Sequence, residues 1–141
     1  MPYKKVNMKE EIRTLAIYRL ERAHESLEEA KLLLQSGHAN TFVNRIYYAC
    51  FYVVSALLFI KGLSSAKHSG VRSLFHKNCV KTGIVDAEMG HLYDMLFDNR
   101  QKGDYSDMVR FKIEDVQHWY DEAHKFVEVI ENLVKKEMST E

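Results

Sequence analysis

The sequence predicts an all-α protein, an up-and-down antiparallel bundle of four to five helices formed by one domain, residues 1–141. Apolar residues recur every three or four positions along several long segments, which is the period of a helix that buries one face. Pro2 is the only proline, the glycines are widely spaced, and no segment alternates with the period of a strand. A chain of this length buries a full core without disulfides, so Cys50 and Cys79 are expected to be reduced and packed.

Two long helices are predicted in the first half of the chain. Residues 9–36 form the first, which carries one apolar stripe and ends at Gly37. Residues 41–61 form the second, which is apolar on nearly every side after Arg45 and must be covered all round, as the central helix or as a dimer contact. Its apolar run of roughly fifteen residues is shorter than the about twenty that cross a bilayer. We therefore expect a buried core helix and no membrane association.

Three further helices are predicted in the second half. A short amphipathic helix of about a dozen residues follows the loop GLSSAKHSG and ends near Gly83. Asp86 is the predicted N-cap of a fourth helix, which is expected to end by Gly103. The segment DYSDMVRF then connects it to the last helix. The last helix, residues 112–137, has the most regular apolar spacing in the chain. Because short loops join these helices, neighbours should pack antiparallel, with the third helix as a smaller insert.

Standard enzyme signatures are absent from the sequence. It has no phosphate-binding glycine loop and no Cys-x-x-Cys pair, and its zero net charge indicates neither a nucleic-acid nor a membrane partner. Glu21 with His24 and Asp121 with His124 have the spacing of a di-iron ligand element. However, Glu21 points about 145° away from the apolar stripe of its helix, and residues 41–61 contribute no carboxylate. We expect no metal and no cofactor. The charged N-terminus lacks a secretory signal, which favours the cytosol.

Two polar elements are candidates for a functional site. Asn44 and Arg45 lie at the start of the most apolar helix, where the helix dipole is positive and an arginine needs an anion, either a carboxylate or a phosphate. Arg100, Asp104 and Tyr105 lie together at the end of the fourth helix, beside a glycine. One interpretation is that Asp104 or a neighbour pairs with Arg45 and clamps the two helices together. The functional alternative is an exposed polar groove.

At these residues the chain resembles the HEPN superfamily, specifically its small stand-alone group found beside minimal nucleotidyltransferases. The resemblance is carried by an ordered set of features. They are the first helix with Ala30 and Leu34, the segment NRIYYACFYVVSALL, the segment KHSGVRSLF, the segment NRQKGDY, and a long apolar-striped terminal helix that reaches Val134. The resemblance implies a dimer of helical bundles with an RNA-facing cleft, acting in toxin–antitoxin or other defence systems.

Catalytic HEPN members are metal-independent ribonucleases with an arginine followed, after about four to six residues, by a histidine. A histidine there moves the proton of a ribose hydroxyl, and the arginine stabilises charge on the phosphate. After Arg100 no histidine follows at that spacing, and Tyr105 stands where one is expected. His68 or His76 can substitute only if the fold brings one of them to Arg100. Some members are modified on a motif tyrosine by the partner nucleotidyltransferase, and Tyr105 is the candidate by position.

The leading hypothesis is therefore a dimeric HEPN protein that acts as the non-catalytic partner or substrate-binding subunit of a small nucleotidyltransferase. The alternative is a metal-independent endoribonuclease toxin, and a third possibility is a helical scaffold that only builds an oligomer. RNA or a nucleotide is the expected ligand, and the sequence leaves open whether the cleft instead holds a protein. The tyrosines of the second helix resemble base-stacking residues, although in so apolar a helix they are more often core. The site residues expected are Arg100, Tyr105 and His68 for catalysis, and Asn44, Arg45, Tyr48 and Asp104 for nucleotide or RNA binding.

Overall fold

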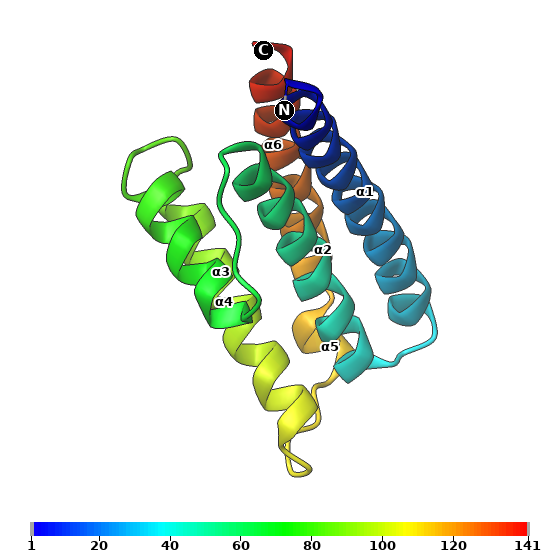
Figure 1. Ribbon diagram of the computed structural model, residues 1–141. Coiled ribbons are helices and arrows are strands. Elements are labelled where there is room, and N and C mark those ends of the chain that lie inside the picture. Colours follow the sequence, from blue (N-terminus) through cyan, green and yellow to red (C-terminus); the bar gives the residue numbers. More distant parts are fainter. Residues whose placement is uncertain (1, 141) are drawn as a thin grey trace.

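The computed structural model describes the backbone of residues 2–140 and the side chains of residues 9–140. Within these residues the chain forms helices and no strand, which confirms the predicted all-α bundle (Figure 1). A π-helical turn, η1 (His76–Val80), continues the third helix. The α-helices are α1 (Pro2–Gln35), α2 (Ala39–Ile60), α3 (His68–Phe75), α4 (Ala87–Tyr105), α5 (Ile113–Val116) and α6 (Trp119–Ser139).

The central element of the bundle is α2 (Figure 1). It packs against α1, α4 and α6, and it also contacts α3 and α5. By length and composition α2 is apolar enough to cross a membrane, but its neighbours bury most of it. A core helix of a bundle passes the same test of composition. The structure therefore confirms the predicted buried core helix.

The first two helices form an antiparallel hairpin (Figure 1). Ala16, Ala23 and Ala30 lie seven residues apart on α1, and none of them is exposed to solvent. Small side chains at this spacing let the α1 backbone approach α2 closely. The hairpin turns at Gly37, whose φ of 78° lies in the left-handed region that favours glycine. The stop signal and the predicted stripe from Ala16 to Ala30 are confirmed, whereas Ile12, the first residue of the predicted stripe, is 37% exposed.

Several predicted boundaries need correction. The last predicted helix, residues 112–137, is two helices, α5 and α6, separated by a turn at Gln117 and His118 whose backbone angles stay in the right-handed helical region. The fourth helix continues through Gly103 to Tyr105 instead of fading at the glycine. A Cβ atom on Gly103 would lie 3.0 Å from Phe111, so this glycine makes room for the following loop and does not end the helix. Asp86 does occupy the N-cap position of α4, although its side chain makes no capping hydrogen bond.

Both cysteines are buried free thiols, as predicted. Burial raises the pKa of Cys50 and of Cys79 above the ordinary value for a thiol. Neither side chain is therefore a reactive thiolate, and both act as small apolar residues of the core.

Candidate functional site

The arginine of the fourth helix lies inside the protein. Arg100 is only 3% exposed. Its guanidinium carbon lies 4.5 Å from the ring centroid of Tyr47, 5.6 Å from that of Phe97 and 6.0 Å from that of Tyr105. Its Nε has no hydrogen-bond partner among the described residues, and its Nη1 lies 3.9 Å from Asp104 Oδ2. Aromatic faces attract a cation, yet a buried charge with so few polar partners costs stability. Such a group calls for a functional explanation.

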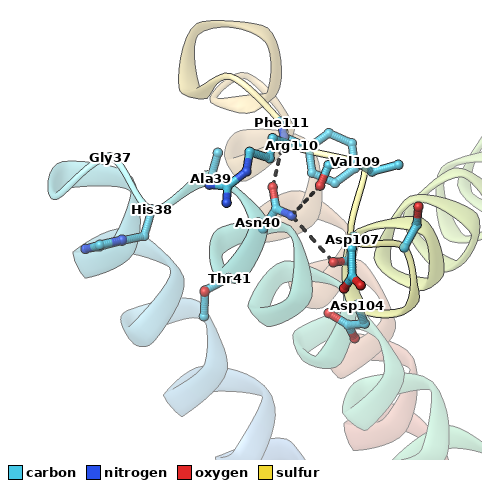
Figure 2. Close-up of a pocket in the computed structure, with 12 residues that line it drawn as sticks. Gly37, His38, Ala39, Asn40, Thr41, Asp104, Asp107, Val109, Arg110 and Phe111 are labelled. Carbon is cyan, nitrogen blue, oxygen red and sulfur yellow. Dashed lines mark hydrogen bonds between the residues drawn. The ribbon is translucent and has the colours of Figure 1, made fainter.

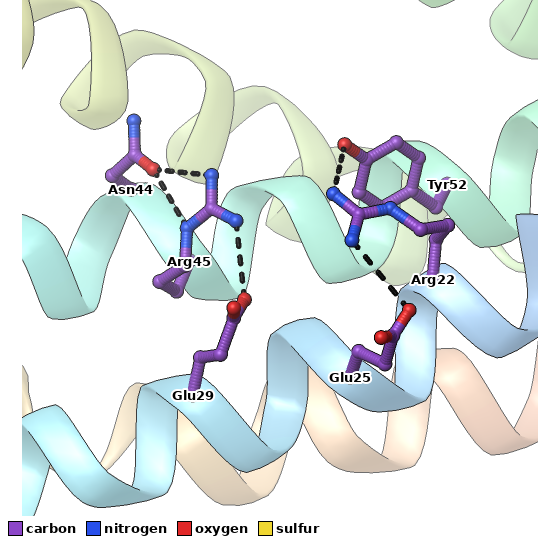
Figure 3. Close-up of polar contacts among 6 residues, drawn as sticks. All are labelled: Arg22, Glu25, Glu29, Asn44, Arg45 and Tyr52. Carbon is purple, nitrogen blue, oxygen red and sulfur yellow. Dashed lines mark hydrogen bonds and ion pairs between the residues drawn. The ribbon is translucent and has the colours of Figure 1, made fainter.

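Polar contacts connect Arg100 with α1 through the two predicted polar elements. Asn44 donates a hydrogen bond of 2.9 Å to Asp104 Oδ2, the oxygen that faces Arg100. Arg45 donates to Asn44 Oδ1 from Nη2 and Nε, at 2.8 and 3.0 Å, and its Nη1 pairs with Glu29 of α1 at 3.2 Å (Figure 3). The expected pairing of Arg45 with Asp104 or a neighbour is wrong, because Arg45 points toward α1. Asn44 makes the contact to α4 instead.

The fold brings His68 to the arginine site. His68 begins α3, and its Nδ1 lies 2.8 Å from the hydroxyl of Tyr47, the ring on which Arg100 rests. Its imidazole also packs on Phe51, with ring centroids 4.4 Å apart. Burial and the nearby charge of Arg100 lower the pKa of His68 below its ordinary value. A neutral His68 with its proton on Nε2 accepts the Tyr47 hydrogen bond at Nδ1.

We predict that His68 makes folding stability depend on pH in the mildly acidic range. Its folded pKa lies below the unfolded value of about 6.5, so the unfolded chain binds more protons between these two values. The stability that neutral His68 contributes is therefore present above the unfolded pKa and is lost as the pH falls toward the folded pKa. Thermal melts between about pH 8 and about pH 5 should show a steeper loss for wild type than for His68→Gln. Parallel curves would contradict this assignment.

The other candidate histidine is held elsewhere. His76 lies in η1, and its Nε2 lies 2.9 Å from Asp94 Oδ1 of α4. It makes no described contact with Arg100. Of the two histidines that the sequence offered as substitutes, the structure therefore places only His68 beside the arginine site.

Tyr105 lies at the surface, at the last residue of α4. Its side chain is 78% exposed, and no described residue hydrogen-bonds to its hydroxyl. Asp104 beside it retains 29% exposure of its side chain. Tyr105 is therefore accessible to a second protein, and its chemical role stays a prediction.

Sequence reasoning interpreted Tyr47 as a core residue and missed its part in the site. It is completely buried, and burial raises its pKa to about 12, so the hydroxyl stays protonated and can donate to His68. A hydroxyl in the middle of an otherwise apolar helix was the available signal, because a buried tyrosine usually has a polar partner. Tyr48, its neighbour, is half-buried, and the Arg45 guanidinium lies 4.9 Å from its ring centroid.

A pocket of about 420 Å³ lies between residues 37–41, at the start of α2, and residues 103–111, which comprise the end of α4 and the loop that follows it (Figure 2). Asn40 fixes that loop on α2. Its Nδ2 donates to the carbonyl of Val109 at 3.0 Å, and its Oδ1 accepts from the backbone N–H of Phe111 at 2.8 Å. Asn40 was not among the site residues predicted from the sequence. An amide side chain in the first turn of an apolar helix was the only signal for it.

The histidines of the two carboxylate-histidine elements have other partners. His24 Nε2 lies 3.0 Å from both carboxylate oxygens of Glu131 on α6, and His124 Nδ1 lies 2.8 Å from Glu128 on its own helix. The acidic residues of the two elements take no part in these contacts. Among the side chains that the structure describes, no group of three or more His, Cys, Asp or Glu residues is placed to hold a metal ion.

The fold and the site define a helical bundle in which an arginine of α4 and a histidine of α3 both contact Tyr47 of the central helix. Residues 16–133 match the HEPN domain, and the chain belongs to this family. A "UPF0332 protein" of Thermotoga maritima is 49% identical over 114 residues, which cover 81% of this chain and 86% of that protein. Two Methanocaldococcus jannaschii proteins bear the name "Putative toxin". One of them is 35% identical over a match that covers 77% of this chain and 74% of that protein. The other is 32% identical over a match that covers 92% of this chain and 93% of that protein.

Proposed function

We propose that this HEPN protein is the non-catalytic partner or substrate-binding subunit of a small nucleotidyltransferase in a toxin–antitoxin or defence-type system, acting as a cytosolic homodimer. The toxin names of the Methanocaldococcus relatives support this setting. The contrast between Arg100 and Tyr105 carries the non-catalytic assignment. Arg100 is 3% exposed and cannot touch a substrate phosphate in this conformation, whereas Tyr105 is 78% exposed.

Tyr105 is the proposed acceptor of the nucleotidyl group. Its oxygen attacks the α-phosphorus of a nucleoside triphosphate held by the nucleotidyltransferase, and the bond from that phosphorus to pyrophosphate breaks. The phenol proton passes to a base of the partner enzyme, because an unactivated phenol is a weak nucleophile at neutral pH. An exposed residue at a helix end suits this role, since a second protein must enclose it.

The nucleotide is proposed to bind where polar side chains of α2 and α4 meet, at Asn44 and Asp104. The Arg45 guanidinium carbon lies over the Tyr48 ring, 4.9 Å from its centroid, and an arginine beside a tyrosine ring is a surface on which a base can stack. Asn44 and Asp104 lie between this pair and Tyr105, where they supply an amide and a carboxylate for ribose hydroxyls. All four residues belong to the sequence-predicted binding set.

A metal-independent endoribonuclease is the second candidate function, favoured by one observation. His68 and Arg100 both contact Tyr47, so the general base and the phosphate-stabilising group of such an enzyme lie together. In this alternative Tyr105 moves aside to uncover Arg100. In the tautomer whose Nδ1–H donates to the Tyr47 hydroxyl, Nε2 of His68 is free to take the proton of the ribose 2′-hydroxyl as its oxygen attacks the phosphorus. The 5′-oxygen of the next nucleotide then leaves and takes a proton from water.

Nucleotide transfer tests the leading proposal. Purified protein, incubated with a small nucleotidyltransferase and ATP labelled at the α-phosphate, should retain label after denaturation. Tyr105→Phe should abolish retention, because the acceptor oxygen is gone. Tyr18→Phe is the matched control, since Tyr18 is also exposed, at 54%, and lies on α1. Equal labelling of Tyr105→Phe and wild type would overturn the assignment.

RNA cleavage tests the alternative. Wild type and Arg100→Met are compared on structured and single-stranded RNAs in the presence of a chelator. We expect no cleavage by either protein. Cleavage by wild type that is lost in Arg100→Met would establish the endoribonuclease and overturn the non-catalytic assignment.

A further inference from the structure

An open groove of about 480 Å³ lies on the third helix and the π-helical turn that continues it. We call it the Lys77 groove, and its lining residues are Ser73, His76, Lys77, Val80 and Lys81. Helix α3 and η1 lie at the outer edge of the bundle, where η1 packs against α4 (Figure 1). Ser73, Lys77 and Lys81 are exposed and follow one another at intervals of four residues. They therefore form a row along one side of the helix, with neighbours about 6 Å apart along its axis.

Positive charge is concentrated around this groove. Residues 30–85 contain seven lysines and arginines and no acidic residue, although the whole chain is neutral. Arg72 is paired with Asp98 of α4 at 3.6 Å. The ammonium groups of Lys77 and Lys81 have no ion pair or hydrogen bond with any side chain that the structure describes. An anion from outside the chain is therefore attracted by both lysines without competition from a bound carboxylate.

The π-helical turn and a glycine of α4 shape the groove. The backbone N–H of Lys81 donates to the carbonyl of His76, five residues back, at 2.8 Å. A Cβ atom on Gly90 would lie 3.1 Å from the His76 ring and 3.2 Å from Val80, so this glycine lets the turn pack closely on α4. Asp94 contacts Nε2 of His76 at 2.9 Å and fixes the ring. Single π-helical turns are rare and frequently lie at functional sites, which supports a ligand at this position.

We propose that the Lys77 groove binds adjacent phosphate groups of one ligand, which is either a free oligophosphate or the backbone of a nucleic acid. The ammonium groups of Lys77 and Lys81, one turn apart, each contact one phosphate, and the hydroxyl of Ser73 donates a further hydrogen bond. A protein partner fits the groove less well, because lysine is depleted at protein interfaces and, of the five lining residues, only Val80 is apolar.

This inference goes beyond the proposed function, because the groove and the proposed acceptor are separate sites. Gly90, which packs against the groove residues, and Tyr105 are both on α4. They lie about 22 Å apart along the helix axis. Phosphate binding in the groove requires neither Tyr105 nor the Arg100 site. Loss of phosphate binding and loss of nucleotide transfer can therefore be observed separately.

Binding of two phosphate compounds tests the proposal. Inorganic tripolyphosphate is titrated by calorimetry, and a fluorescent single-stranded oligouridylate is titrated by anisotropy, both at low ionic strength. The double variant Lys77→Ala, Lys81→Ala should bind about tenfold more weakly than wild type, because two exposed charge contacts are lost. The matched control is Lys125→Ala, Lys136→Ala, which removes the same charge from exposed positions of α6. Circular dichroism checks that both double variants fold.

The two compounds also separate the two sources of phosphate. Tripolyphosphate binding that is weakened in the double variant assigns the groove to a free oligophosphate, whereas oligouridylate binding alone assigns it to a nucleic-acid backbone. In the second case the slope of log affinity against log salt should become less steep by about 1.4, since each single-strand phosphate contact contributes about 0.7. No binding of either compound by wild type, or equal binding by the Lys77, Lys81 variant and the control, would overturn the proposal.

Discussion

Arg100→Glu is expected to destabilise the protein by about 4 kcal/mol, because it places an uncompensated carboxylate in a buried site. The wild-type guanidinium rests on the faces of Tyr47 and Tyr48, which attract cations and repel anions. The new carboxylate would also lie close to Asp104. Denaturant unfolding followed by circular dichroism measures the loss.

Arg100→Met is the informative control for this prediction. Methionine keeps much of the volume and removes a buried charge whose Nε has no partner among the described residues. Asp104 keeps its hydrogen bond from Asn44 and remains partly exposed, so it is not left as a buried unpaired charge. We expect the free energy of unfolding of Arg100→Met to lie within about 1 kcal/mol of the wild-type value, or to exceed it. A loss as large as that of Arg100→Glu would mean that the arginine is structural.

Tyr47→Ala is expected to cost a similar amount, about 4 kcal/mol of unfolding free energy. The ring is completely buried and contacts rings of Tyr93, Phe97 and His68, so truncation leaves a cavity that α2, α3 and α4 share. Tyr47→Phe retains the ring and loses only the hydrogen bond to His68, at a cost of about 1 kcal/mol. Urea unfolding of both variants separates packing from the hydrogen bond. Equal losses in the two variants would show that the hydroxyl, and not the ring, dominates.

The backbone architecture was largely predictable because each long helix has its own distribution of apolar residues, which indicates how much of it is buried. Only α2 is apolar on nearly every side, so only α2 can be the centre. The break between α5 and α6 was not predictable in the same way. The spacing of Val116, Trp119, Tyr120 and Ala123 continues a helical period across it, and no glycine or proline marks it.

The residues of the candidate site were predictable, but their partners were not. Arg45 binds Glu29 and not Asp104, since the choice depends on how far α2 is rotated between α1 and α4. The burial of Arg100 could not be predicted either, because arginines are mostly exposed and the rings that cover it come from several helices. His68 was found as a chemical candidate, while its contact with Arg100 through Tyr47 required the fold.

The central position of α2 also bears on how the protein opens. Because α2 is packed against α1, α4 and α6 together, its middle turns cannot be exposed to water while the other helices remain in place. Their amide hydrogens should therefore exchange with solvent only when the whole bundle unfolds, whereas helix ends exchange through local fraying. Tyr47 lies in the turns that are expected to exchange slowly and Tyr105 lies at the end of α4, so we expect the site to join a slowly exchanging and a rapidly exchanging part of the molecule.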